Sequence, residues 1–402
     1  MDFRIHNIKS ILSWDPIQDK LVCKDDKEIF ISNGVIKNID HKVNQTSNDI
    51  DAQNLVLTPG FIDSHTHPIF IGNRANELAM RVSGKSYEQI STEGGGILSS
   101  ILDLRKSSFE NLYKASEFNV CNVYKNGTTT LEAKSGYGLT LDQEIKSLEV
   151  IKILNKKLQI EIVPTFLGAH AIPPEFEGKK DEYVDLICNE MIPAVAEKQL
   201  AEFCDVFCEK GYFNYDQSLK ILETAKKYGI MPRLHADEFV DSGGAKLAAE
   251  VRALSADHLM AISDDGISAL KKSDVIATLL PGTTFFLGKS NYVNGRKLID
   301  SGIEVALATD FNPGSCTINS LPMIMQIAVL NCGLTIEEAF KGVTWNAAKS
   351  LNRHLNNGII KNEYNADFIL WDIESLDEIP YWFGNDRIVS VYKNGLQIYS
   401  RS

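Results

Sequence analysis

The stretch PGFIDSHTHPIF, residues 59–70, decides the predicted fold, because in it a short apolar strand ends in polar, titratable side chains. Seven further apolar runs of strand length follow, and stretches with helical periodicity separate most of them. The eight predicted strands are Val56–Asp63, Thr128–Ala133, Ile160–Phe166, Glu202–Cys208, Pro232–His235, Ala253–His258, Val275–Leu280 and Val305–Thr309. Eight strands within roughly 255 residues match the count and size of a closed (β/α)8 barrel.

An open, doubly wound sheet is the alternative fold for alternating strands and helices. Such a sheet binds its ligand where the strand order reverses, usually through a glycine-rich phosphate turn after the first strand. In this chain the first strand ends in histidines instead. We therefore predict an α/β fold whose main part is a TIM-like (β/α)8 barrel, with helices that include Leu141–Leu154, Asp216–Tyr228 and Ser242–Glu250.

Both ends of the chain differ from the middle, because they are rich in short strands. Asn33-Gly34 and Asn394-Gly395 are typical of tight hairpin turns, and strand-like runs flank each of them. We predict that the two terminal segments meet in space and form one small β-sandwich outside the barrel. The predicted domains are residues 1–57 and 356–402 for the two parts of the sandwich, and residues 58–355 for the barrel.

The composition is that of an acidic globular protein. Hydrophobic residues make up 44% of the chain and charged residues 23%, and the formal net charge is −12. An acidic chain without a basic block is a poor nucleic-acid binder, and no apolar run approaches the ~20 residues that a membrane span needs. The seven cysteines form no CxxC pair, which favours reduced thiols. Because Arg4 and His6 also interrupt any signal peptide, we expect a cytoplasmic protein without nucleic-acid or membrane partners.

Polar and titratable residues follow six of the predicted strands directly. The segments are DSHTH (63–67), EAKSGYG (132–138), LGAH (167–170), HADE (235–238), ADH (256–258) and TDFNPG (309–314), and they hold five of the eight histidines. In a barrel of parallel strands these carboxyl-terminal ends meet on one face, which is where barrel enzymes have their active sites.

His65 and His67 lie on the same side of the first strand, because side chains alternate along a strand. Two imidazoles suit a metal such as zinc or iron, although an HxH pair alone is a weak signal. Together with His235 and Asp310 at two other strand ends, they make a His3Asp set with a position left open for water. A bound water then loses a proton near neutral pH and becomes a nucleophile.

Three further residues have roles that the spacing alone leaves open. Glu238, three residues after His235, could move a proton between water and a leaving nitrogen, or it is a surface acid at a helix start. His258 could hydrogen-bond an oxyanion or the water, or it is a core histidine. His170 could contact the substrate, with the same structural alternative.

The chain resembles the amidohydrolase superfamily and, within it, the imidazolonepropionase family. The stretches that carry this resemblance are PGFIDSHTHPIF (59–70), GGGI (94–97), AKSGYGL (133–139), PTFLGAHAIPPE (164–175), HADE (235–238), ADHL (256–259), ATDFNPGS (308–315), VTWNAA (343–348) and ADFILWD (366–372). They extend over the whole barrel and to the end of the chain, and AKSGYGL and LGAHAIPPE are far more specific than HTH.

The resemblance implies one Zn2+ or Fe ion per chain, a small-molecule substrate and a homodimer. The implied reaction is hydrolysis of 4-imidazolone-5-propanoate to N-formimidoyl-L-glutamate. The implied metal ligands are His65, His67, His235 and Asp310, and the implied catalytic residues are Glu238, His258 and Asp310. The implied substrate-binding residues are Arg74, Tyr137, His170, Glu238, His258, Asn312, Gly314 and Ser315.

Three alternatives remain at this point. A cytosine- or guanine-type deaminase of the same superfamily would share the metal ligands, and only Arg74, Tyr137 and His170 argue against it. A two-metal enzyme would want a bridging lysine at the fourth strand, and Lys210 follows that strand closely. A barrel that has lost catalysis and serves as a scaffold should also have lost ligands, and all four are present.

Overall fold

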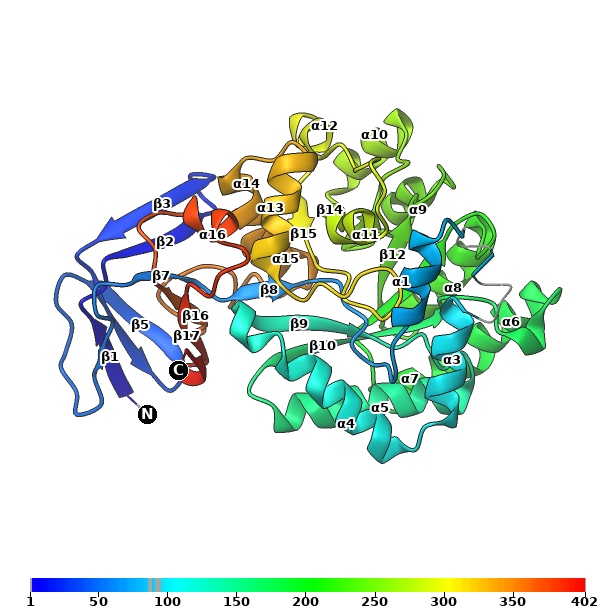
Figure 1. Cartoon of the computed structure of the whole chain (residues 1–402), viewed down its shortest axis with the longest axis horizontal. Coiled ribbons are helices and arrows are strands. Elements are labelled where there is room, and N and C mark those ends of the chain that lie inside the picture. Colours follow the sequence, from blue (N-terminus) through cyan, green and yellow to red (C-terminus); the bar gives the residue numbers. More distant parts are fainter. Residues whose placement is uncertain (1, 86–88, 91–94, 402) are drawn as a thin grey trace.

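A barrel of eight parallel strands forms the centre of the molecule (Figure 1). The computed structural model of the chain describes residues 2–85, 89–90 and 95–401. The barrel strands pair in chain order and are β8 (Phe61–Asp63), β9 (Thr128–Lys134), β10 (Glu161–Ala169), β11 (Phe203–Cys208), β12 (Met231–Ala236), β13 (Ser255–His258), β14 (Ile276–Leu279) and β15 (Val305–Leu307). The predicted (β/α)8 barrel is therefore confirmed, and the open doubly wound sheet is excluded.

The barrel closes between its first and last strands, just beyond their carboxyl ends. The backbone of Thr66 forms a parallel bridge with Phe311, and the Asp310 amide donates to the carbonyl oxygen of His65 at 3.0 Å. The His67 amide donates in turn to the carbonyl oxygen of Phe311 at 2.9 Å. The closure thus joins the HxH segment directly to the segment that carries Asp310.

Helices surround the barrel and are packed on its outer side (Figure 1). They are α1 (Ala75–Val82), α3 (Ile97–Lys106), α4 (Phe109–Cys121), α5 (Leu141–Lys157), α6 (Lys180–Leu186), α7 (Ile192–Glu197), α8 (Tyr215–Lys227), α9 (Gly244–Val251), α10 (Asp264–Ser273), α11 (Pro281–Phe286), α12 (Gly295–Asp300), α13 (Leu321–Asn331), α14 (Ile336–Val343), α15 (Trp345–Ser350) and α16 (Glu378–Tyr381). Short helical turns lie at Tyr124–Asn126, Pro174–Phe176 and Ile187–Met191. The three helices predicted from periodicity are α5, α8 and α9. Among the described residues, no helix combines the length and the apolar character that crossing a membrane requires.

The two chain ends meet in a pair of antiparallel-rich sheets beside the barrel (Figure 1). One sheet has the order β5-β4-β1-β6 and the other the order β18-β17-β16-β7-β2-β3. Their strands are β1 (Asp2–His6), β2 (Ser10–Asp15), β3 (Lys20–Asp25), β4 (Glu28–Ser32), β5 (Val35–Asp40), β6 (Ile50–Asp51), β7 (Val56–Pro59), β16 (Phe368–Trp371), β17 (Ile388–Lys393) and β18 (Leu396–Ser400). Ile5 and Ile31 of the first sheet share a buried core with Leu57 and Phe368 of the second, as the predicted sandwich requires.

Both predicted hairpin turns are present. Asn33 and Gly34 join β4 to β5 with φ of 51° and 79°, and Asn394 and Gly395 join β17 to β18 with φ of 49° and 73°. Positive φ at both central residues defines the tight turn that matches the strand twist, and Asn followed by Gly adopts it most easily.

The prediction that Val56–Asp63 forms a single strand is wrong. It consists of two strands, because β7 pairs with β2 and β16 of the terminal sheet while β8 pairs with β9 of the barrel. Gly60 separates them, and a Cβ there would lie 2.4 Å from the side chain of Thr129. A side chain at position 60 would therefore collide with Thr129, and glycine lets the chain change sheets within one residue. The domain boundaries 1–57, 58–355 and 356–402 stay a prediction.

Candidate active site

A cavity of about 490 Å3 opens at the carboxyl ends of the barrel strands. Eleven of the twelve predicted site residues line it, namely His67, Arg74, Tyr137, His170, His235, Glu238, His258, Asp310, Asn312, Gly314 and Ser315. The twelfth, His65, is fully buried and lies against His67 and His235. The barrel thus brings together side chains that are up to 250 positions apart in the chain.

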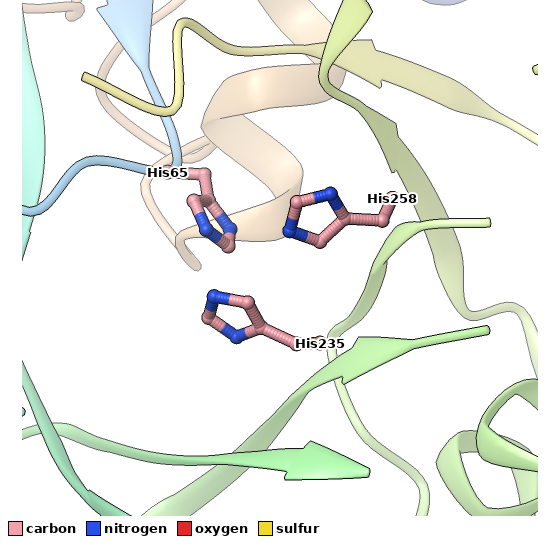
Figure 2. A group of neighbouring side chains, drawn as sticks. All are labelled: His65, His235 and His258. Carbon is pink, nitrogen blue, oxygen red and sulfur yellow. The ribbon is translucent and has the colours of Figure 1, made fainter. Parts of the chain in front are cut away.

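Among the described residues, three overlapping groups of possible metal ligands share His65, and two of these groups lie at one end of this cavity. One consists of His65, His67 and Asp310, and the other of His65, His235 and His258. In each group the ligand atoms lie within 4.8 Å of one another, and Figure 2 shows the three rings of the second group turned toward a common space. The four predicted ligands are therefore divided between two groups that share His65, and His258 is an additional candidate.

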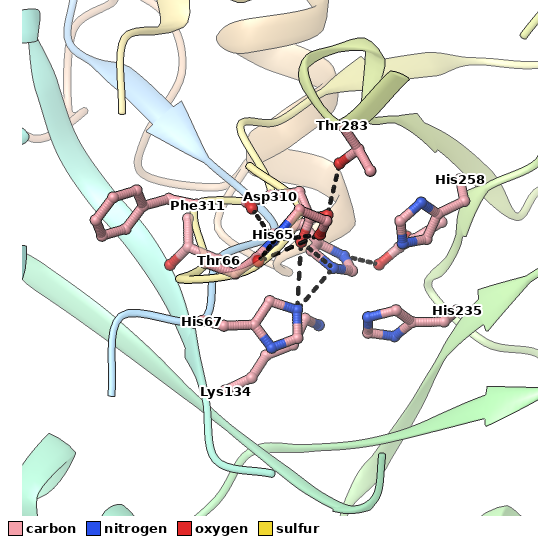
Figure 3. A network of polar contacts seen from close by, with 12 residues as sticks. His65, Thr66, His67, Lys134, His235, His258, Thr283, Asp310 and Phe311 are labelled. Carbon is pink, nitrogen blue, oxygen red and sulfur yellow. Dashed lines mark hydrogen bonds and ion pairs between the residues drawn. The ribbon is translucent and has the colours of Figure 1, made fainter. Parts of the chain in front are cut away.

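The nitrogens and oxygens of the first group converge closely (Figure 3). The Nε2 atoms of His65 and His67 are 3.3 Å apart, and they lie 3.5 Å and 3.4 Å from Oδ1 of Asp310. The hydroxyl of Thr283 donates to Oδ2 of Asp310 at 2.7 Å, so that the other carboxylate oxygen faces the imidazoles.

Buried carboxylates hold the far side of two imidazole rings. Nδ1 of His65 donates to Oδ2 of Asp257 at 2.7 Å, and Nδ1 of His235 lies 2.9 Å from Oδ2 of Asp205. A proton on Nδ1 leaves the lone pair on Nε2, and this is the nitrogen that each ring presents to the cavity.

Two buried cations join these carboxylates beneath the site. Nζ of Lys134 donates to Asp205 at 2.7 Å and to Glu132 at 2.8 Å. The Arg233 guanidinium donates to Asp257 at 3.2 Å and lies 3.2 Å from the same Glu132 oxygen. All five side chains are fully buried, and the two cations and three carboxylates form one charge network of formal charge −1 under the imidazoles.

The protonation states of three of the histidines and of Asp310 suit a cation. Burial lowers the pKa of His65 well below its usual value and lowers the pKa values of His67 and His258 to about 4. Burial by itself would raise the pKa of Asp310, but the hydrogen bond and charge of His67 hold that pKa well below its usual range. Neutral imidazoles and an ionised carboxylate are the forms that bind metal ions. At His235, burial would lower the pKa, but the charge of Asp205 raises it above its usual value, so metal binding there would release a proton.

The donor set therefore fits a divalent metal. Lone pairs on adjacent Nε2 atoms and a carboxylate oxygen repel one another unless a positive charge lies between them. Nitrogen ligands with one carboxylate are the ligand set of catalytic zinc and of several iron sites.

Glu238 and His258 lie on the wall of the cavity next to this cluster. Nε2 of His258 is 3.8 Å from Oε2 of Glu238, and burial together with the charge of Asp310 raises the pKa of Glu238 to about 8. The backbone of His258 has φ of 77° and that of Asp310 has φ of 52°. Such values are uncommon outside glycine and occur both at tight turns and at functional sites.

The remaining predicted residues form the rest of the cavity wall. His170 stacks on His67 with ring centroids 5.1 Å apart, and Tyr137 packs edge-on against His170 at 5.3 Å. Asn312 is a loop anchor, because its Oδ1 accepts from the amides of Gly314 at 2.8 Å and Ser315 at 2.7 Å. Its side chain thereby holds the segment 312–315 in place at the cavity.

Sequence reasoning gave no role to several residues that the structure brings to the site. Asp205 and Arg233 lie within apolar strands. A charged residue in such a strand indicates a buried ion pair, because a buried charge needs a partner of opposite sign. Glu77 and Arg81 follow Arg74 at intervals of three and four positions, which is the spacing of one helix face. Lys210, the candidate bridging lysine of a two-metal site, is exposed and is not among the residues that line the cavity. Gly94 of the GGGI stretch lies outside the described residues.

Comparison with known proteins shows the class to which this fold and site belong. The model of the amidohydrolase family matches residues 56–398, and the chain belongs to that family. An imidazolonepropionase of Bacillus cytotoxicus is 46% identical over 88% of this chain and 83% of its own length. An imidazolonepropionase of Kosmotoga olearia is 44% identical over the full length of both chains. Within the amidohydrolases, the chain belongs to the imidazolonepropionase family.

Solved structures agree on the fold. A guanine deaminase of Escherichia coli has a TM-score of 0.75 at 15% identity and covers both chains completely. A 5-methylcytosine deaminase of Klebsiella pneumoniae has a TM-score of 0.76 at 16% identity, covering 99% of this chain and 98% of its own. At such low identity the likeness concerns the fold alone.

Proposed function

We propose that this chain hydrolyses 4-imidazolone-5-propanoate to N-formimidoyl-L-glutamate. The proposal is supported by full-length similarity to imidazolonepropionases and by a cavity that joins a cation-binding cluster to guanidinium groups. The observation that carries it is Arg74, because this buried cation lines the same cavity as the His and Asp cluster. A substrate with a reactive ring and a carboxylate tail needs both features at once.

We propose one Zn2+ or Fe ion per chain, held by His65, His67, His235 and Asp310. A bound ion would supply Lewis acidity and make a water molecule acidic enough to react near neutral pH. His65 and His235 are suited to this role, because Asp257 accepts from Nδ1 of His65 and a carboxylate oxygen of Asp205 lies 2.9 Å from Nδ1 of His235, which leaves Nε2 of each ring for a metal.

Glu238 is the proposed proton carrier. Hydrolysis adds the oxygen of water to the ring carbonyl carbon, breaks the bond from that carbon to the ring nitrogen, and moves one proton from water to the nitrogen. A buried carboxylate with a pKa of about 8 can accept the proton and release it again near neutral pH. His258, at 3.8 Å from Glu238, is placed to hydrogen-bond the oxygen that gains negative charge.

The other end of the substrate is assigned to the cations and the loop of the cavity wall. Arg74 would bind the propionate carboxylate, and His170 and Tyr137 would pack against the ring. Asn312, Gly314 and Ser315 would contact the product, in which hydrolysis has created a second carboxylate. These assignments are predictions, as are the homodimer and the cytoplasmic location. Sedimentation of the purified protein tests whether it is a dimer.

Arg74→Ala tests the substrate assignment against the deaminase alternative, because cytosine and guanine carry no carboxylate. We expect kcat/KM for imidazolone propionate to fall roughly 10–150-fold, the range for loss of a charge-assisted hydrogen bond. The penalty should be absent for an imidazolone whose propionate is replaced by a propyl group. An equal loss on both compounds would show that Arg74 does not bind the carboxylate.

A further inference from the structure

Two loops at the ends of neighbouring strands carry Tyr137 and His170 to the cavity. The first loop spans residues 135–139 and lies between β9 and α5, and the second begins where β10 ends. The same loops form the most specific stretches of the chain, AKSGYGL and LGAHAIPPE. The contacts of the other residues in these stretches show how the two cavity side chains are held.

The backbone of the first loop has two residues in an unfavourable conformation. Gly136 has φ of 107°, and a Cβ there would lie 2.9 Å from the carbonyl oxygen of Leu167. Leu139 has φ of 57°, in the left-handed region that residues with a side chain rarely adopt. Such a backbone persists only where surrounding contacts hold it, so the loop depends on its partners for its shape.

The carboxylate of Glu144 provides these contacts. Its Oε1 accepts from the backbone amides of Gly138 at 2.9 Å and Leu139 at 2.8 Å, and its Oε2 accepts from the amide of Gly136 at 3.1 Å. Glu144 lies in the first turn of α5, but its oxygens reach back past the N-cap residue Thr140 to the loop. The side chain is fully buried and is not among the residues that line the cavity.

The second loop is tied to the first by His170 itself and by Tyr183 of α6. Because a carbonyl oxygen can only accept, Nδ1 of His170 donates to the carbonyl oxygen of Gly136, at 2.9 Å. The Tyr183 hydroxyl donates to the carbonyl oxygen of Gly168 at 2.8 Å and lies 3.2 Å from that of Leu139. Tyr183 is also fully buried and is not a lining residue, so it acts on the cavity through the loops.

We propose that Glu144 and Tyr183 are positioning residues that hold Tyr137 and His170 against the substrate ring. This inference rests on the proposed function, in which those two side chains pack against the ring. Glu144 fixes the loop that carries Tyr137, and the Gly136 carbonyl of that loop fixes the ring of His170. Without the carboxylate, three buried amides would lose their acceptor and the loop would relax.

The first test is the kinetics of Glu144→Gln, which keeps the size of the side chain but replaces an accepting oxygen by an NH2 group. We expect kcat/KM for imidazolone propionate to fall roughly 10–100-fold, mainly through KM, because the ring wall moves while the metal ligands stay. Tyr183→Phe removes a single hydroxyl from the same pair of loops and should give a smaller rise in KM. This second variant tests the proposal even if Glu144→Gln does not fold.

Coupling to His170 separates positioning from a general loss of stability. His170→Ala should cost at least about threefold less in the Glu144→Gln background than in the wild-type protein, whereas independent sites add to within roughly twofold. The hydrogen-bonded Nδ1 proton of His170 gives a readout that needs no substrate. Its magnetic resonance signal, assigned by its absence in His170→Ala, should shift or broaden in Glu144→Gln.

Asp367→Asn provides a matched control. Asp367 is a buried carboxylate that accepts from the amide of Asn394 at 2.8 Å and does not line the cavity. The control should lower Tm and leave both KM and the His170 signal unchanged.

Additive losses in the double variant, or an unchanged His170 signal in Glu144→Gln, would overturn the role of Glu144 while the wild-type protein still hydrolyses the substrate. A wild-type KM in Tyr183→Phe would overturn the role of Tyr183. Wild-type protein that leaves imidazolone propionate unchanged would overturn the proposed function and the role in ring binding together, whatever the His170 signal shows.

Discussion

The environment of Glu238 differs strongly from that of an ordinary surface acid. It lies three positions after His235, beyond the end of β12, and is 9% exposed on the cavity wall. Burial and the charge of Asp310 raise its pKa to about 8, so that its proton is exchangeable near neutral pH. Nε2 of His258 lies 3.8 Å from its Oε2, too far for a hydrogen bond that would fix the charge of Glu238.

Glu238→Gln should keep the metal and lose most of the rate. The substitution preserves size and polarity but removes the proton carrier, and general acid–base catalysis typically contributes ~100- to 10,000-fold. Elemental analysis and steady-state kinetics on the same preparation measure both quantities. If the variant retained more than about a tenth of the wild-type kcat, Asp310 or His258 would be the proton carrier instead of Glu238.

Four of the barrel strands carry the buried charged residues that hold the metal-binding imidazole rings in place. These strands are β9, β11, β12 and β13. Each contributes a buried charged side chain beneath the imidazoles, and Lys134 and Arg233 offset two of the three negative charges of the carboxylates. Because the strands are adjacent and parallel, these side chains meet at one level of the barrel. These charged residues lie inside the barrel, so the positions of the imidazole rings do not depend on surface loops.

Lys134→Met should weaken metal binding, because Asp205 loses the cation that holds it against His235. Loss of such supporting contacts typically lowers metal affinity about 10–100-fold. Competition with a chelator measures the affinity, and thermal unfolding of the metal-free protein reports stability separately. Lys393→Met is the matched control, since Lys393 also bonds a buried carboxylate, Asp367, at 2.7 Å. That pair lies in the terminal sheet, so the control should lose stability and retain metal affinity. Unchanged affinity in Lys134→Met would contradict the supporting role.

At the scale of the whole molecule, a charge cluster fastens the carboxyl-terminal segment to the base of the barrel. Glu161, the first residue of β10, accepts from Arg353, from Asn357 at 2.9 Å and from Lys393 at 3.3 Å. Burial alone would raise the pKa of Glu161, but the charges of Lys393 and Arg353 lower it below its usual value. The cluster therefore joins the barrel to the terminal sheet at the end opposite the cavity.

Glu161→Gln should destabilise the protein at neutral pH by roughly 1–3 kcal/mol, the cost of removing one charged hydrogen-bond partner. A lowered pKa in the folded state means that the contribution of Glu161 is complete above its unfolded pKa of about 4.3. It is lost as the pH falls through the folded value. The difference in unfolding free energy between wild type and variant should therefore shrink below about pH 5.

Denaturant unfolding at several pH values measures this difference. The exposed pair of Glu363 and Lys37, at 2.7 Å, provides the control, because Glu363→Gln should change stability little at any pH. A Glu161→Gln penalty that stays constant from pH 7 to about pH 3 would contradict the account.

The barrel and most of the residues that line the cavity could be predicted from the sequence, because both follow from local patterns. His67, His235 and Asp310 come directly at or after apolar runs, and the barrel brings all such strand ends to one face. The change of sheet at Gly60 could not be predicted, because one continuous apolar run serves two sheets there. Its cause is the close approach of Thr129, which is 69 positions away.

The supporting residues escaped prediction for a related reason. Asp205 and Arg233 lie inside apolar strands, and their partners become visible only when neighbouring strands are aligned. Glu77 looks like any acid in the first turn of a helix, where negative charge is favourable. Only its burial against Arg74 and the Gly96 amide distinguishes it from a capping residue.

The central claim is that this cavity opens the ring of imidazolone propionate by adding water. The most direct measurement is incubation of the purified, metal-loaded protein with that compound, followed by mass analysis of the product and an ammonia assay. The account predicts loss of the ring chromophore, a product heavier by one water molecule and no ammonia, and it predicts no turnover for His65→Ala. An unchanged substrate, or stoichiometric ammonia release, would contradict it.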